Sequence, residues 1–215
     1  MAASEISICN LALGMIGADS IRSFDEDNKR ARLCKVFYEH ARDQILFLAD
    51  WSFSRRYVTI RRIDHEEMGI QVPEGISVYA KPADCMCPRD VGYFGSREWW
   101  RINGEYIWLR LSLDEVGLFY SAKIVNTVQF SEPFIEALSL HLAFRLAMPV
   151  AQNREIANAL FQQFQVTLNQ YIADDANQGS EYKYPDDIAD LDTFVNTDRP
   201  SIMTLDLKPW LRFTD

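Results

Sequence analysis

The chain has 215 residues, of which 48% are hydrophobic and 25% are charged, and its formal net charge is −9. This length suits one domain with an insertion, or two small domains. The acidic balance argues against a protein that grips nucleic acid, because such proteins usually carry a basic face. No stretch is expected to be long and apolar enough to span a bilayer, which takes about 20 residues.

The N-terminal segment MAASEISICN lacks the basic and then apolar layout of a signal peptide, so we expect a cytosolic protein with reduced thiols. The charge is uneven, because residues 174–215 hold ten acidic and four basic side chains and so contribute −6 of the −9. The same segment keeps many large apolar residues, which a purely disordered tail would lack. It is therefore predicted to be an extended arm without a core of its own.

The first elements are predicted to be helical. Ser4 is expected to cap a short helix over about residues 6–16, and Gly17 is expected to end it. A longer helix is predicted over about residues 31–50. Its apolar residues recur at helical spacing and form one buried stripe, made of Cys34, Tyr38, Ala41, Ile45 and Leu48.

From Arg55 to Val128 the hydrophobic period changes to two, which predicts antiparallel strands. Asn103-Gly104 lies between two strand-like runs and predicts a hairpin with a type I′ turn, in which both central residues have positive φ. Helical patterns then resume. Ser131 and Pro133 are expected to begin a buried helix that ends by Pro149.

A last helix is predicted from Asn153 to about Ala176. The predicted fold is therefore α+β, an antiparallel helical bundle with a small antiparallel β unit inserted between its helices and an extended C-terminal arm. The bundle is assigned to residues 1–54 and 129–179. The β unit takes residues 55–128, and the arm takes residues 180–215.

Candidate catalytic and metal-binding residues have simpler structural interpretations. His40 lies near Asp43 on the flank of a helix, which favours a surface position over an acid–base pair. His141 lies in the most apolar helix and is expected to be a hydrogen-bonded core residue. Cys85 and Cys87 do not have the C-x₂₋₄-C spacing of structural zinc sites. No phosphate-binding loop is present, so no catalytic, cofactor or metal site is predicted.

The strand region offers one surface that could contact nucleic acid. The arginine run of Arg55, Arg56, Arg61 and Arg62 could meet phosphates. Trp99, Trp100 and Trp108 could stack on bases. The simpler interpretation is that the arginines are solvated strand residues and that the tryptophans pack within the β unit or contact a partner. A nucleic-acid-binding module therefore remains an alternative, and a hydrolase is a third class that would need a pocket with perturbed titratable groups.

The order of four segments resembles the head-to-tail adaptor family of tailed bacteriophages, often called tail tubular protein A. These segments are ICNLALGMIGADSIRSF, NKRARLCKVFYEHARDQILFLADWSFS, YAKPADCMCPRDV and FSEPFIEALSLHLAFRLAMPV. Lys81 stands where the family more often has an apolar residue before Pro-Ala-Asp. The resemblance covers about residues 6–176 and leaves the C-terminal arm unmatched.

The resemblance implies a structural virion protein and no enzyme. It implies a homo-oligomeric ring of about twelve subunits, located at the head–tail interface and present in the host cytoplasm during assembly. The expected partners are the portal protein, a tail nozzle or tail tube protein, and viral DNA that passes through the lumen without sequence-specific binding. No cofactor and no membrane are expected. The predicted partner contacts are Trp99, Trp100, Phe194, Leu207, Trp210 and Phe213.

Overall fold

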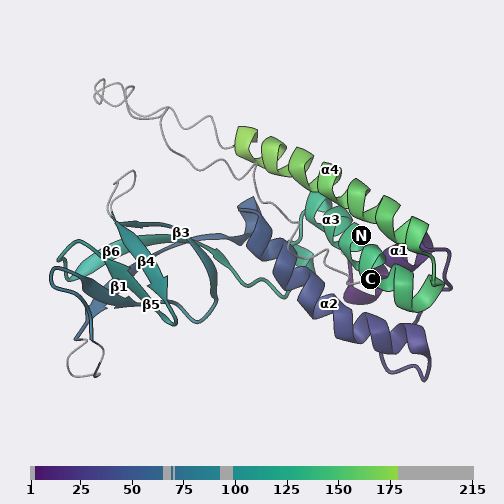
Figure 1. Ribbon diagram of the computed structural model, residues 1–215, viewed down its shortest axis with the longest axis horizontal. Coiled ribbons are helices and arrows are strands. Elements are labelled where there is room, and N and C mark those ends of the chain that lie inside the picture. The colour runs from purple at the N-terminus through teal and green to yellow at the C-terminus, as the bar shows by residue number, and fades with distance from the viewer. Residues whose placement is uncertain (1–2, 65–68, 70, 93–98, 179–215) are drawn as a thin grey trace, which may run out of the picture. The chain divides into compact units, whose positions relative to one another are not determined.

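The computed structural model describes residues 3–64, 69, 71–92 and 99–178, with side chains described as far as residue 173 (Figure 1). Residues 1–177 form one compact unit, and residues 178–215 are assigned to a second. The predicted arm, residues 180–215, lies outside the described residues. So do four predicted partner contacts, Phe194, Leu207, Trp210 and Phe213.

The described residues form four α-helices and six strands. The helices are α1 (Glu5–Met15), α2 (Lys29–Leu48), α3 (Glu132–Leu146) and α4 (Arg154–Gln178). The strands are β1 (Arg55–Ile63), β2 (Ser77–Ala80), β3 (Cys85–Gly92), β4 (Trp100–Asn103), β5 (Tyr106–Leu109) and β6 (Glu115–Ala122). Short 3₁₀ turns at Ser52–Ser54 and Thr127–Gln129 flank the sheet in the sequence, and a π-helical turn at Ala147–Ala151 follows α3.

The predicted architecture of a helical bundle with a small inserted β unit is wrong. The main body is a six-stranded antiparallel sheet, in the order β3-β6-β1-β2-β5-β4, together with four helices. β1 makes the sheet continuous, because residues Arg55 to Arg61 pair with β6 while Arg62 and Ile63 pair with β2. Alternation in the sequence indicated strands, but it carries no information about which strands share an edge.

Local signals placed the ends of the first helix correctly. Ser4 forms a capping box with Ser7, in which each side chain bonds the backbone of the other residue. Gly17 follows α1 with a φ of +70°, a conformation that glycine adopts without a steric penalty. α2 begins two residues earlier than predicted, because the side chain of Asn28 accepts a hydrogen bond from the Ala31 amide at 2.8 Å.

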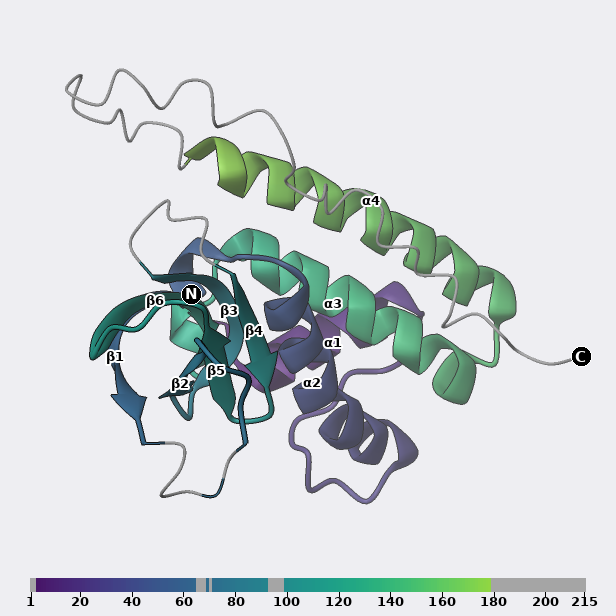
Figure 2. The same cartoon turned by 60° about the vertical axis from the view of Figure 1, so that its left-hand side comes forward.

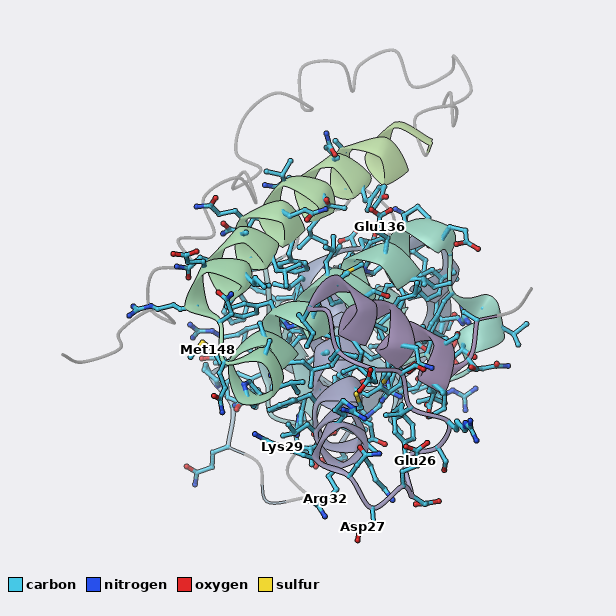
Figure 3. All side chains as sticks on the ribbon, turned by 90° about the vertical axis from the view of Figure 1, so that its right-hand side faces the viewer. Glu26, Asp27, Lys29, Arg32, Glu136 and Met148 are labelled. Atoms are coloured by element: carbon cyan, nitrogen blue, oxygen red, sulfur yellow. The ribbon has the colours of Figure 1, made fainter. Side chains whose placement is uncertain are left out.

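Charged side chains hold the turn before α2. Glu26 accepts hydrogen bonds from the amides of Arg22 and Ser23, and Arg32 pairs with Asp27 at 2.9 Å. Figure 3 shows Glu26, Asp27 and Arg32 gathered at the start of the helix. Pairs this exposed contribute little to stability by themselves, so they define the local conformation more than the global fold.

α3 is the central helix of the helical part. α1 and α2 both pack against it, and α4 runs beside it with ring contacts such as Phe144–Phe161, whose centroids are 5.1 Å apart (Figure 2). Contrary to the sequence-based expectation, one segment, Glu132–Ala151, is long and apolar enough to cross a membrane by length and composition. Its apolar window is 61% buried within the protein, as in a core helix.

An aromatic cluster lies where the chain passes between the helices and the sheet. Trp51 and Phe53 precede β1, and Phe130 and Phe134 follow the sheet in the sequence. The rings of Phe130 and Phe134 are 4.7 Å apart, and Phe53 and Trp51 contact Phe134 edge-on at 5.1 and 5.2 Å. The Trp51 indole N–H also donates to the Ile45 carbonyl at 2.9 Å. The segment that leads from α2 into the sheet and the segment that leads from the sheet into α3 are thereby packed together.

The hairpin at Asn103-Gly104 forms, but its turn differs from the predicted type I′. Asn103 pairs with Tyr106, so the two central residues are Gly104 and Glu105. Positive φ occurs at Gly104 and not at Glu105, which is the pattern of a type II′ turn. The glycine therefore takes the first central position, and Asn103 belongs to β4.

The burial of α2 predicts opposite outcomes for two neighbouring substitutions. Ala41 is fully buried and His40 is exposed. Ala41→Asp should lower the free energy of unfolding by more than about 3 kcal/mol, because it buries a carboxylate without a partner. His40→Gln should change it by less than about 0.5 kcal/mol. Urea unfolding measures both, and equal tolerance of the two changes would contradict this assignment of the helix face.

Candidate functional site

A polar hollow of about 810 Å³ lies where β1, β2 and β6 meet. Its lining includes two arginines, Arg61 and Arg62, and three acids, Asp64, Asp114 and Glu115. Arg61 binds Glu115 at 2.8 Å, and Arg62 binds Asp114 at 3.0 Å. The acids outnumber the arginines, so the hollow is a poor match for a phosphate.

The other arginines of β1 also bond within the protein. Arg55 binds the Asp50 carboxylate at 3.0 Å and the Asp50 carbonyl at 3.0 Å. Arg56 donates to the carbonyls of Phe53 and Arg55 at 3.1 and 2.8 Å. The arginine run that suggested a nucleic-acid surface is therefore largely engaged in internal contacts.

The two tryptophans predicted to contact a partner are separated by the strand. Trp99 precedes β4 and is 48% exposed, whereas Trp100 is partly buried and packs against the core. Alternate residues of a strand point to opposite faces, so the pair cannot form one continuous aromatic surface. Trp108 of β5 has a buried indole nitrogen without a hydrogen-bond partner in the described structure. Of the three, Trp99 is the one with a large exposed surface.

His40 is not part of an acid–base pair with Asp43. One oxygen of Asp43 binds Arg42 at 2.8 Å, and the other binds Lys123 at 2.9 Å. Arg42 is almost completely buried, and Lys123 lies in the segment that follows β6. Asp43 therefore ties α2 to that segment.

The prediction that His141 is a hydrogen-bonded core residue is confirmed. Its Nε2 lies 3.0 Å from the Gln44 side-chain oxygen and accepts from Arg145 Nε at 3.0 Å. Burial, together with the charge of Arg145, lowers the pKa of His141 to about 3. The imidazole is therefore neutral in the folded protein near neutral pH.

The cysteines are free thiols, as expected. Cys9 of α1 and Cys34 of α2 are both fully buried, and a hydrogen bond between them, together with burial, raises the pKa of Cys9. Cys85 is buried at the start of β3, and burial raises its pKa to about 11. No group of three or more His, Cys, Asp or Glu side chains within the described residues could hold a metal ion.

A polar junction, which the sequence did not reveal, joins the end of α2 to the sheet. Arg89 of β3 donates to the carbonyls of Phe47 and Ala49 at 3.3 and 2.8 Å, and to the Ser121 hydroxyl at 2.8 Å. Ser121 in turn donates to Asp50 at 3.1 Å. A guanidinium at this position donates to carbonyls that have no partner within the helix. Its positive charge also interacts favourably with the negative, C-terminal end of the helix dipole.

Arg89 could have been suspected because it is a charged residue between Pro88 and Asp90 in a strand-like run. Its partners Ser121, Ala49 and Phe47 lie 32, 40 and 42 positions away in the sequence. No local pattern specifies such a pairing. The polar junction therefore has a structural role, because its donors and acceptors form hydrogen bonds with one another.

Comparison with known proteins finds no family model that matches the chain and no curated protein that matches it significantly. The resemblance to head-to-tail adaptors therefore stays a prediction from the order of segments.

The polar junction yields a stability prediction. Arg89→Gln should lower the free energy of unfolding by about 2 kcal/mol, because it removes charge-assisted hydrogen bonds to otherwise unsatisfied carbonyls. Arg110→Gln, an exposed change directly after β5 of the sheet, is the matched control and should stay within about 0.5 kcal/mol. Chemical denaturation followed by circular dichroism distinguishes them. A neutral Arg89→Gln would mean that water replaces the guanidinium without loss.

The buried histidine yields a pH prediction. His141 titrates at about pH 6.5 when unfolded and at about 3 when folded, so between these values only the unfolded state gains the proton. The free energy of unfolding should therefore fall as the pH drops below about 6.5, by up to about 1.4 kcal/mol per pH unit from this group.

Denaturation of the wild type and of His141→Gln from pH 4 to pH 8 measures this contribution as the difference between two curves. The carboxylates titrate in both proteins and cancel in the comparison. The exposed His40→Gln variant should follow the wild type. Parallel curves for wild type and His141→Gln would contradict the depressed pKa of His141.

Proposed function

We propose that this chain is a structural virion protein, a head-to-tail adaptor that forms a ring between the portal and the tail of a tailed bacteriophage. The observation that carries the proposal is the set of large apolar side chains on outward faces of the helices. Leu11 and Met15 lie one turn apart on α1, Val36 lies on α2, and Val166 lies on α4. Other faces of these helices are already packed in the core.

Exposed apolar side chains on several elements suit a subunit that is covered by neighbours on more than one side. Heterologous contacts between identical subunits close into a ring when the rotation permits it. Met148 adds a further exposed apolar group in the π-helical turn after α3, and it lies at the periphery in Figure 3. Such contacts would bury surface that a monomer leaves in water, which favours association.

The charge distribution supports a conduit more than a nucleic-acid clamp. Arg61 and Arg62 pair with acids, and the chain as a whole carries −9. An acidic lumen repels phosphate and lets DNA pass, whereas a binding module needs basic groups that can release counterions. Under this proposal DNA traverses the ring without being held.

The proposed partners are the portal on one side and a tail nozzle or tail tube protein on the other. Trp99, whose side chain is 48% exposed, is proposed as one such contact. Phe194, Leu207, Trp210 and Phe213 of the C-terminal arm are proposed as anchors, because ordering an extended segment costs about 1–2 kcal/mol per residue and needs several buried side chains to offset it.

Mass photometry of the full chain, alone and with the portal of the same virion, tests the adaptor function. The expected result is a ring of about twelve subunits, favoured by high concentration or by the portal. Deleting residues 182–215 should preserve the cooperative thermal transition but weaken association with the ring or the portal.

A strict monomer that never binds the portal would rule out the adaptor function. Loss of the cooperative transition on deletion would place the arm in the core of the monomer. Retention on immobilised DNA that decreases steeply with salt would favour the nucleic-acid module instead.

A further inference from the structure

Among the strands that the structure describes, β4 has an unpaired outer edge. β4 ends the strand order, and no strand of the described residues lies beyond it. The opposite edge, β3, is protected, because it carries register shifts and contains Pro88, which lacks an N–H. Arg89 further ties β3 to α2. β4 is short and carries Arg101, but it contains no proline and its pairing with β5 shows no register shift.

The backbone of β4 presents hydrogen-bonding groups outward. The Arg110 amide donates to the Trp99 carbonyl at 2.9 Å, so residue 99 bonds toward β5. Successive residues of an antiparallel strand alternate between bonding to one side and to the other. Trp100 and Ile102 therefore direct their N–H and C=O groups away from β5, toward the open edge.

The side chains at this edge are apolar on one face and basic on the other. Ile102 is 44% exposed and lies across from Ile107, on the same face as Trp100. Arg101 lies on the opposite face of the strand. Neither Arg101 nor Arg110 has a carboxylate partner among the described residues. The edge thus presents unpaired backbone, an apolar face and a positive charge.

One segment of the same chain has the complementary pattern. Residues 202–208 read IMTLDLK, in which Met203, Leu205 and Leu207 alternate with Thr204 and Asp206. This period of two is typical of a strand with one apolar face. Pro209 follows directly and would end the pairing. The segment itself holds one acid, Asp206, and one base, Lys208, which stands at the end of the alternating run.

We infer that β4 of one copy accepts residues 202–208 of a second copy as an added strand. Met203, Leu205 and Leu207 cover the face of Trp100 and Ile102, and Asp206 lies on the face of Arg101. Addition of a strand to an open edge supplies main-chain hydrogen bonds for affinity and alternate side chains for specificity. Because the donor segment and the acceptor edge are different parts of the chain, each copy can donate to one neighbour and accept from another, so the contact repeats along the assembly.

This inference deepens the proposed ring and rests on the self-association that the ring requires, but the contact needs no portal. The test uses two full-length variants. Ile102→Pro removes an N–H that points outward and leaves the bonds between β4 and β5 in place. Leu205→Pro interrupts the donor pattern. Each variant alone should have a self-association constant at least about tenfold below that of the wild type, as measured by sedimentation velocity.

The decisive measurement is the equimolar mixture. One variant keeps its donor segment and the other keeps its acceptor edge, so one intact contact can form between them. The mixture should give dimers and nothing larger, whereas the wild type continues to larger species. Asn196→Pro, which places a proline in the C-terminal region outside the alternating segment, is the matched control and should associate like the wild type.

Thermal melting of Ile102→Pro verifies that the variant is folded. If it is not, Arg101→Glu replaces it, because this change keeps the backbone of β4 and repels Asp206. Association of Arg101→Glu should be reduced, and combining it with Asp206→Arg in the same chain should restore it. Failure of that restoration would overturn the inference.

Three other results would also overturn it. These are a wild type that stays monomeric at every concentration, variants that associate like the wild type, and a mixture that shows no dimers. Portal binding is measured separately, so the two proposals can fail independently. Rings that bind the portal, together with no dimers in the equimolar mixture, would contradict only the strand contact. Dimers in the mixture without any portal binding would contradict only the adaptor function.

Discussion

The aromatic cluster of Trp51, Phe53, Phe130 and Phe134 is the constraint on which the rest of the structure depends. The chain leaves the helices through the first two residues and returns through the last two, with the whole sheet between them in the sequence. Edge-on ring contacts have defined geometry and add to the free energy of simple burial. Because both crossings meet at one cluster, α3 follows the sheet from a fixed starting point beside α2.

Apolar burial alone does not specify orientation, since it is non-directional. The polar junction supplies the direction. Arg89, Ser121 and Asp50 link three segments that are far apart in the sequence, and each bond has a donor and an acceptor that must be aligned. Removing such groups from water costs free energy unless they are fully hydrogen-bonded. Here the Arg89 guanidinium donates to carbonyls at the C-terminal end of α2.

The role of the charged residues in the β region depends on their ion-pair partners. The run of arginines in β1 suggests a phosphate surface when it is considered alone. Opposite Glu115 and Asp114, the same arginines are neutralised and line a hollow with more acid than base. Within the described residues, the arrangement leaves Arg101 and Arg110 as cations without a carboxylate partner.

The sequence by itself determined the features that depend on near neighbours. The Ser4 cap, the glycine after α1 and the core position of His141 follow from spacings within a few turns of helix, and the structure agrees with them. The predicted stripe of α2 is also buried, except that Leu48 is only partly buried. The glycine hairpin was also predictable, although the turn type was not, because the type depends on which residues the strands take up.

Only the tertiary structure decided how large the sheet is and what its charges do. β1 bridges two groups of strands, and Arg61 meets an acid 54 positions away, which is an arrangement that no local period encodes. The same holds for the end of α2, whose carbonyls are satisfied by a residue of β3. The physical reason is that hydrophobic periodicity reports which face of an element is buried, whereas the partner on that face is selected by packing of the entire chain.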